Sequence, residues 1–296
     1  MHYFLITLIF FSSIEVVSKE LMEYMGPFEM TFFRFSLGLA GLLLYSVAKG
    51  TYKDFMKLGR KDYSLMSLLG FINIFFSMSV LQYAIKHGSP AVVALIFSSN
   101  PIFVYAISVF LKNDLLCMKK ISGFILGLAG LAVVLIDDIK YIELEKGALF
   151  ALAGSVSFAI FTVLNRKAVK DHRPVIVNIV SFAFGLMFIA VYFLIRGSLD
   201  FSPEIFDSAA RTVRLVYLGI FVTAVGYITF LNAIKTMGPV ASSLIFLFKP
   251  ALATVFALIL INERIGMNFY AGLILSAAGS YLILKKNKIK ASECVR

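Results

Sequence analysis

The most regular feature of the chain is a succession of long apolar stretches separated by short polar segments. Each stretch holds about 20 residues, enough for an α-helix rising about 1.5 Å per residue to cross about 30 Å of hydrocarbon. Strands of a membrane barrel would be shorter and would alternate apolar with polar positions. We therefore predict an all-α integral membrane protein with ten transmembrane helices, at residues 3–21, 28–48, 63–85, 90–111, 118–136, 147–165, 174–195, 213–234, 239–261 and 266–284.

The composition agrees with this pattern. Of the 296 residues, 60% are hydrophobic and 15% are charged, whereas soluble domains carry about 25% charged residues. The predicted helices occupy nearly the whole chain and leave no room for a soluble catalytic or ATP-binding domain. The three histidines lie near helix ends, and no glycine-rich phosphate loop is present. We expect no enzyme activity, no cofactor and no metal site.

The net charge of +11 has an uneven distribution along the chain. With the N-terminus inside, most basic residues fall in cytoplasmic segments, such as "KKNKIK" at 285–290. The positive-inside rule then places both termini in the cytoplasm of a multi-pass plasma membrane protein whose partner is the lipid bilayer, not nucleic acid. Cys117 and Cys294 fall on the same side, where we do not expect a disulfide.

The two halves of the chain resemble each other. "YAIKHGSPAVVALIFSSNP" (83–101) aligns without a gap with "NAIKTMGPVASSLIFLFKP" (232–250). Other matches keep the same order: Lys19, Pro27, Gly38 and Gly50 align with Arg166, Pro174, Gly185 and Gly197. We predict two domains, 1–140 and 141–296, of five helices each. Because five is odd, the second enters the membrane from the opposite side, an inverted repeat typical of secondary transporters.

Two charged residues lie deep inside predicted helices. Lys249 is near the middle of its helix, about 15 Å from water, too far for easy snorkelling. A charge there costs about 2.5–3.5 kcal/mol, so it should face the bundle interior and have a partner. Glu15 is the one acid at similar depth, about one helical turn away. We predict that the two form an ion pair, either as a working site or as a structural bridge.

Two prolines occupy equivalent places in the fourth and ninth predicted helices. Pro101 follows Asn100, and Pro250 follows Lys249. Each proline frees a backbone carbonyl, which is tolerated at this depth when buried or when facing a water-filled cavity. We predict helix breaks that line a cavity near the membrane midplane. Further candidates for the cavity lining are polar and aromatic residues of the third, fourth, eighth and ninth helices: Asn73, Ser77, Phe97, Tyr227 and Phe246.

Two other features receive a structural interpretation. Arg34 lies about two turns from the outer end of its helix, so we expect it to reach the interface or to pair with Glu29 or Glu23. "GFILGLAG" (123–130) and "GLILSAAG" (272–279) carry small residues at helical spacing, which lets helices approach closely. We interpret these two helices as packing scaffold or dimer contact, and we leave monomer and homodimer open.

These residues together resemble the drug/metabolite transporter superfamily, specifically its ten-helix EamA-type branch. The resemblance covers the whole chain and includes "EVVSKELMEYMGPFEMTFFRF" (15–35), the two "AIK…P" hairpins and "LINERIG" (260–266). It implies two inverted five-helix repeats around a central cavity. It also implies export or exchange of small organic solutes without ATP, with the fifth and tenth helices away from the cavity.

"SSIEVVSKELM" (12–22) is also similar to the first helix of small multidrug resistance proteins. Their membrane-embedded glutamate, which Glu15 matches, binds protons or cationic drugs. Lys249 departs from that pattern and would repel a cationic substrate. We therefore favour a secondary transporter of small metabolites such as amino acids, working by alternating access, with a proton as a candidate second ligand. Efflux of cationic drugs and exchange of sugar phosphates or nucleotide sugars remain alternatives.

Overall fold

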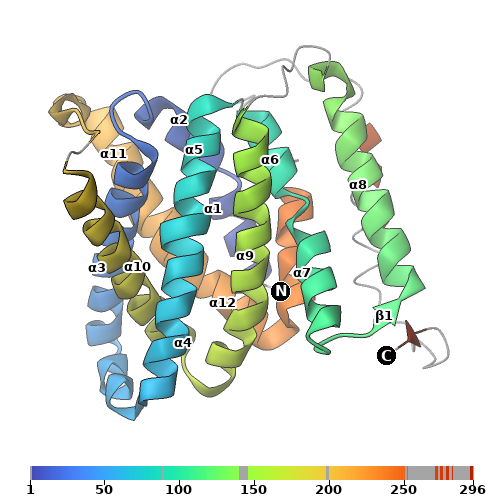
Figure 1. The fold of residues 1–296 in the computed structure, drawn as a ribbon, viewed down its shortest axis with the longest axis horizontal. Helices are drawn as coiled ribbons and strands as arrows, with labels where there is room; N and C mark the ends of the chain where they lie inside the picture. The colour runs from blue at the N-terminus through green and yellow to red at the C-terminus, as the bar shows by residue number, and fades with distance from the viewer. Residues whose placement is uncertain are drawn as a thin grey trace.

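The computed structural model describes residues 2–88, 90–139, 146–197 and 200–250, together with 252, 271–272, 274–275, 278–279, 282 and 294–295. This part of the chain is a bundle of helices packed side by side (Figure 1). Five helical stretches in it are long and apolar enough to cross a membrane: Pro27–Ala48, Arg60–His87, Gly147–Asp171, Pro174–Arg196 and Ala209–Met237. The prediction of an all-α membrane protein is confirmed. Residues 251 and 253–261 of the predicted helix 239–261, and most of the predicted helix 266–284, lie outside the described residues.

The elements follow the chain in two runs. The first comprises α1 (His2–Phe11), α2 (Ile14–Leu21), α3 (Pro27–Ala48), η1 (Thr51–Lys57), α4 (Arg60–Gly70), η2 (Phe71–Met78), α5 (Ser79–His87), α6 (Pro90–Phe97), α7 (Asn100–Phe110), β1 (Leu116–Cys117) and α8 (Met118–Ile139). The second comprises α9 (Lys146–Asp171), α10 (Pro174–Arg196), η3 (Pro203–Asp207), α11 (Ala209–Tyr217), η4 (Leu218–Val225), α12 (Gly226–Met237), α13 (Pro239–Ser243) and β2 (Cys294–Val295).

Several of the apolar stretches are interrupted helices. The first stretch turns at Ser12–Ser13 between α1 and α2, and the fourth turns at Ser98–Ser99 between α6 and α7. The serine hydroxyls bond to carbonyls of the preceding turn: Ser12 Oγ to Leu8 O at 2.7 Å and Ser98 Oγ to Ala94 O at 2.6 Å. Such bonds compete with the helical ladder. A further interruption, at Leu244, separates α13 from the helical residues 245–250.

Two glycines, one directly before the π-helix η2 and one within the π-helix η4, let neighbouring helices approach closely. A Cβ added at Gly70 would lie 2.3 Å from the carbonyl oxygen of Ser181 on α10. A Cβ at Gly219 would lie 2.4 Å from the Cβ of Leu37 on α3. Only glycine fits at these two contacts, which join α10 to α4 and η2, and α3 to η4.

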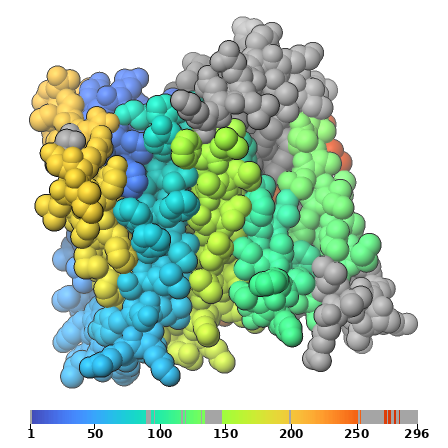
Figure 2. Space-filling model, viewed as in Figure 1, coloured from blue at the N-terminus to red at the C-terminus, as the bar shows by residue number. Residues whose placement is uncertain are grey.

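The long helix α8 forms one edge of the bundle (Figures 1 and 2). A Cβ at Gly279 would lie 2.5 Å from the carbonyl oxygen of Gly123 and 2.6 Å from the nitrogen of Gly127. The small residues of the predicted fifth and tenth helices therefore pack against each other. This confirms their interpretation as a packing surface.

The two short strands give a result that the sequence did not predict. β1 pairs antiparallel with β2, which places Cys117 opposite Cys294. Cys117 is disulfide-bonded, and the chain has two cysteines. The expectation that no disulfide forms is therefore wrong in this structure. It rested on the inferred compartment, whereas strand pairing brings together two residues that are far apart in the sequence.

Candidate functional site

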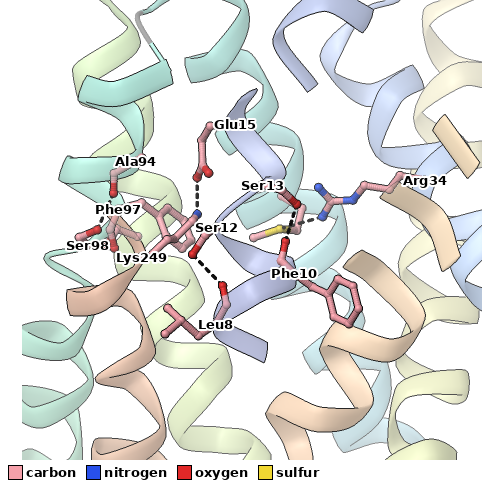
Figure 3. Close-up of polar contacts among 12 residues, drawn as sticks. Leu8, Phe10, Ser12, Ser13, Glu15, Arg34, Ala94, Phe97, Ser98 and Lys249 are labelled. Atoms are coloured by element: carbon pink, nitrogen blue, oxygen red, sulfur yellow. Dashed lines mark hydrogen bonds and ion pairs between the residues drawn. The ribbon is translucent and has the colours of Figure 1, made fainter. Parts of the chain in front are cut away.

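The predicted ion pair between Glu15 and Lys249 is present at the centre of the bundle (Figure 3). Lys249 Nζ donates a hydrogen bond to Glu15 Oε1. Both side chains are 1% exposed. The second carboxylate oxygen, Glu15 Oε2, has no hydrogen-bond partner in the part of the chain that the structure describes. The pair is therefore fully removed from water and keeps one free acceptor.

Interrupted helices position both members of the pair. Glu15 lies in the first turn of α2, directly after the Ser12–Ser13 turn, where the positive end of the helix dipole stabilises a carboxylate. The ammonium of Lys249 lies 5.3 Å from the ring centroid of Phe97, a cation–π distance. The Phe97 ring packs edge-on against Phe246, with centroids 5.6 Å apart. The predicted residues Phe97 and Phe246 thus lie beside the pair.

The predicted helix break near Pro101 is also present. Pro101 falls in the first turn of α7, where its missing N–H leaves no hydrogen bond unmade. Ser155 on α9 spans the break: its hydroxyl donates to the freed carbonyl of Phe97 at 3.4 Å, and its carbonyl accepts from Asn100 Nδ2 at 2.7 Å. Around Pro250 the structure differs, because residues 245–250 are helical and the interruption comes earlier, at Leu244.

The other predicted lining residues divide into two groups. Tyr227 OH donates to Asn73 Oδ1 at 3.3 Å, and both side chains are buried. The ring centroids of Tyr227 and Phe11 lie 5.4 Å apart, and Phe11 in turn stacks on Phe246 with centroids 6.2 Å apart. This aromatic group joins Tyr227 and Asn73 to the surroundings of the ion pair. Ser77 instead donates to the Gly154 carbonyl at 2.8 Å, a contact between η2 and α9 that serves packing.

Arg34 does not lie where the sequence interpretation put it. Its side chain is 0% exposed, and Nη2 donates to Met78 Sδ at 3.4 Å. Glu29 is held elsewhere, by Arg196 at 3.5 Å and by the Asp200 N–H at 2.9 Å. Five positions along an α-helix correspond to about 140° of rotation, so Glu29 and Arg34 leave α3 on different faces. That spacing was the available sequence signal against their pairing.

The buried charges around the Glu15–Lys249 pair do not balance. Besides Lys249, the buried guanidinium of Arg34 also points toward the segment of α2 that carries Glu15 (Figure 3). Among the described residues around the ion pair, two cations thus share one acid, and buried charges require compensation. The same part of the chain contains no group of three metal-ligating side chains. The arrangement suits an organic solute with a negatively charged group.

The helices and the buried charges define a multi-pass membrane protein with a polar centre, the arrangement of transporters. The model of the EamA-like transporter family matches residues 1–136 and 145–285. The chain belongs to this family, and the predicted membership of the drug/metabolite transporter superfamily is confirmed.

Known proteins agree with this assignment. An "Uncharacterized transporter" of Clostridium kluyveri is 31% identical over 294 residues, covering 97% of this chain and 93% of that protein. An "S-adenosylmethionine uptake transporter" of Rickettsia bellii is 27% identical over 167 residues, covering 56% of this chain and 55% of that protein. A solved crystal structure has the same fold, with a TM-score of 0.75 at 18% identity and 95% of each chain covered. The names indicate a transporter and not an enzyme.

Proposed function

We propose that this protein is a secondary active transporter that exports or exchanges small organic metabolites, with amino acids as the preferred class. The observation that carries the proposal is the Glu15–Lys249 ion pair. Each of its two side chains is 1% exposed, and the pair is held between interrupted helices. Interrupted helices with polar groups at the membrane midplane are the usual binding sites of such transporters. Glu15, Lys249 and Asn100 form the binding site, with Phe97, Phe246, Tyr227 and Asn73 around it.

The chemistry of the pair favours a zwitterion. Glu15 and Lys249 neutralise each other when no substrate is bound. An amino acid brings a carboxylate for Lys249 and an ammonium for Glu15, so both buried charges keep a partner of opposite sign. The head group of S-adenosylmethionine is itself an α-amino acid, and a relative carries that solute in its name. Lys249 would repel a cationic drug, and Glu15 would repel the phosphate group of a sugar phosphate.

The two domains, 1–140 and 141–296, act in this proposal as inverted repeats of five helices. The family model matches the chain twice, at 1–136 and 145–285, which supports two repeats. Equivalent helices also end in the same way, at a glycine with positive φ. Gly50, one residue after Lys49 at the end of α3, has a φ of 65°, and Gly197, at the end of α10, has a φ of 69°. The π-helices η2 and η4 occupy corresponding places in the third and eighth helices.

Alternating access requires a closure at each end of the site, and Lys19 supplies one. Its ammonium donates to three carbonyls at the end of α5: Ile85 at 2.8 Å, Lys86 at 3.2 Å and Gly88 at 2.9 Å. The aligned Arg166 on α9 is exposed. If both termini face the cytoplasm, the Lys19 end of the bundle faces the outside of the plasma membrane. The site is then closed toward the outside.

Replacing Lys19 with methionine is expected to open the outer end, because three charge-assisted hydrogen bonds disappear. In a chain with Cys117 and Cys294 changed to alanine, a Ser18→Cys probe would then react at least about tenfold faster with a membrane-impermeant thiol reagent on intact cells. Lys86→Met, at the same end, is the control and should leave the rate unchanged. Equal rates in both variants would contradict the proposed closure.

A ligand screen tests the proposed substrate class. Thermal unfolding of the purified protein is measured with amino acids, nucleosides, sugar phosphates and quaternary amines. Amino acids are expected to raise the Tm, because they bind the folded state, and the other three classes are not. Stabilisation by a quaternary amine alone would overturn the proposal in favour of drug efflux.

Proton coupling follows from competition for Glu15. The substrate ammonium and a proton bind this carboxylate in turn, so that a proton takes the place of the released substrate and crosses in the opposite direction. Glu15→Gln is expected to abolish uptake of a radiolabelled amino acid mixture driven by a pH gradient in everted vesicles. Glu20→Gln, which removes an exposed acid of the same helix, is the control. Undiminished pH-driven uptake by the Glu15 variant would exclude the proton role.

A further inference from the structure

Three buried side chains on helices beside the ion pair carry polar atoms that have no hydrogen-bond partner among the described residues. Arg34 and Gln82 are each 0% exposed, as is Ser18. Arg34 Nε and Nη1, both side-chain atoms of Gln82 and the hydroxyl of Ser18 have no hydrogen-bond partner among the described residues. An unsatisfied buried polar group destabilises a folded protein, and a charged one does so most. The three side chains come from α2, α3 and α5, of which α5 packs against the other two, so a polar ligand between these helices would supply the missing partners.

The three side chains extend the site away from Lys249. Ser18 follows Glu15 by three positions on α2, and Gln82 follows Met78 by four, so each lies one turn further along the same helix face. Met78 is the residue whose sulfur accepts from Arg34. The helices that carry them are neighbours, since α5 packs against both α2 and α3. Figure 3 shows Arg34 reaching from α3 toward the segment of Ser13 and Glu15.

The guanidinium of Arg34 is built to hold an anion that the structure does not supply. It has five N–H donors, and among the described residues its hydrogen bond goes to the thioether of Met78, which is a weak acceptor. Its Cζ also lies 4.9 Å from the ring centroid of Phe35. A carboxylate would replace the sulfur with two parallel charge-assisted hydrogen bonds.

We propose that Arg34 is a substrate-binding residue and that the solute is an acidic amino acid, with two carboxylates and one ammonium. This inference rests on the proposed function and narrows its substrate class. Arg34 and Lys249 each take a carboxylate, Glu15 takes the ammonium, and Gln82 and Ser18 bond to the remaining polar atoms. Each buried charge then has one partner of opposite sign, whereas a neutral amino acid leaves one cation unpaired.

Binding of glutamate and aspartate, each compared with glutamine and asparagine, tests this inference. We expect the purified protein to bind the two acids at least about tenfold more tightly than their amides in thermal-shift titrations. Arg34→Met should abolish that preference and still bind the amides. Arg34→Lys should weaken glutamate binding because a lysine lacks the planar fork. Arg214→Met, at an exposed pair with Glu20, is the control and should bind like the wild type.

The two proposals fail in different ways. Equal binding of acids and amides, or a preference for the acids that survives in Arg34→Met, would overturn the role of Arg34 and leave amino acid transport in place. Absence of any shift with all four amino acids would overturn the proposed substrate class itself. A lower Tm of Arg34→Met without ligand does not affect the comparison, because each variant serves as its own reference.

Discussion

Lys249→Met is expected to lower amino acid counterflow in proteoliposomes at least about 30-fold, because it removes the buried cation that a substrate carboxylate binds. The Lys249 ammonium contacts Glu15 and lies 5.3 Å from the Phe97 ring centroid, and methionine has similar length without the charge. The same change leaves the Glu15 carboxylate buried and unpaired, which costs about 3–5 kcal/mol. The measurement is exchange of a radiolabelled amino acid mixture across the vesicle membrane.

Lys57→Met is the matched control for this variant. Lys57 pairs with Asp54 at 2.6 Å and its side chain is 73% exposed, so the loss of its charge should leave counterflow unchanged. Counterflow by Lys249→Met at the wild-type rate would show that the substrate does not use this cation.

Gly70→Ala is expected to destabilise the folded protein and to lower its Tm by at least about 4 °C. The added Cβ would lie 2.3 Å from the carbonyl oxygen of Ser181 and 2.9 Å from the backbone nitrogen of Gly185. Because these are backbone atoms, no rotamer change relieves the overlap, and α10 must move away. The measurement is thermal unfolding of the purified protein in detergent, with size-exclusion chromatography to detect aggregation.

A second glycine in the same part of the chain provides the control. A Cβ at Gly59 would find its nearest neighbour, Asp62 Oδ2, at 3.6 Å, an ordinary contact. Gly59→Ala should therefore leave the Tm within about 1 °C of wild type, since surface changes away from special features alter stability little. A Tm for Gly70→Ala equal to that of Gly59→Ala would contradict the close packing of α10 on the end of α4.

The sequence allowed prediction of features that the membrane makes obligatory. A charge at the centre of a bilayer must have a partner, and Glu15 was the one acid at the depth of Lys249, so their pairing followed without a structure. Pro101 cannot donate a helical hydrogen bond, so an interruption near it followed too. The length of the apolar stretches likewise predicted the membrane helices, because a helix needs about 20 apolar residues to cross the hydrocarbon.

Features that depend on packing were not predictable in this way. The interior position of Arg34 depends on the rotation of α3, which a hydrophobic helix pattern does not define. The turn at Ser12–Ser13 contains no proline, although the triplet "FSS" at 11–13 recurs at 97–99, where the fourth helix also turns. The π-helices have no local signature, and strand pairing alone brought Cys117 opposite Cys294.

The most direct test of a working Glu15–Lys249 site is counterflow by the double variant Glu15→Gln with Lys249→Met. This change removes both charges at once, so no unpaired charge stays buried, and thermal unfolding shows whether the protein remains folded. If the pair binds substrate, counterflow of the radiolabelled amino acid mixture stays as low as in Lys249→Met. Counterflow restored to the wild-type rate would contradict that role and would show that the pair is a structural bridge.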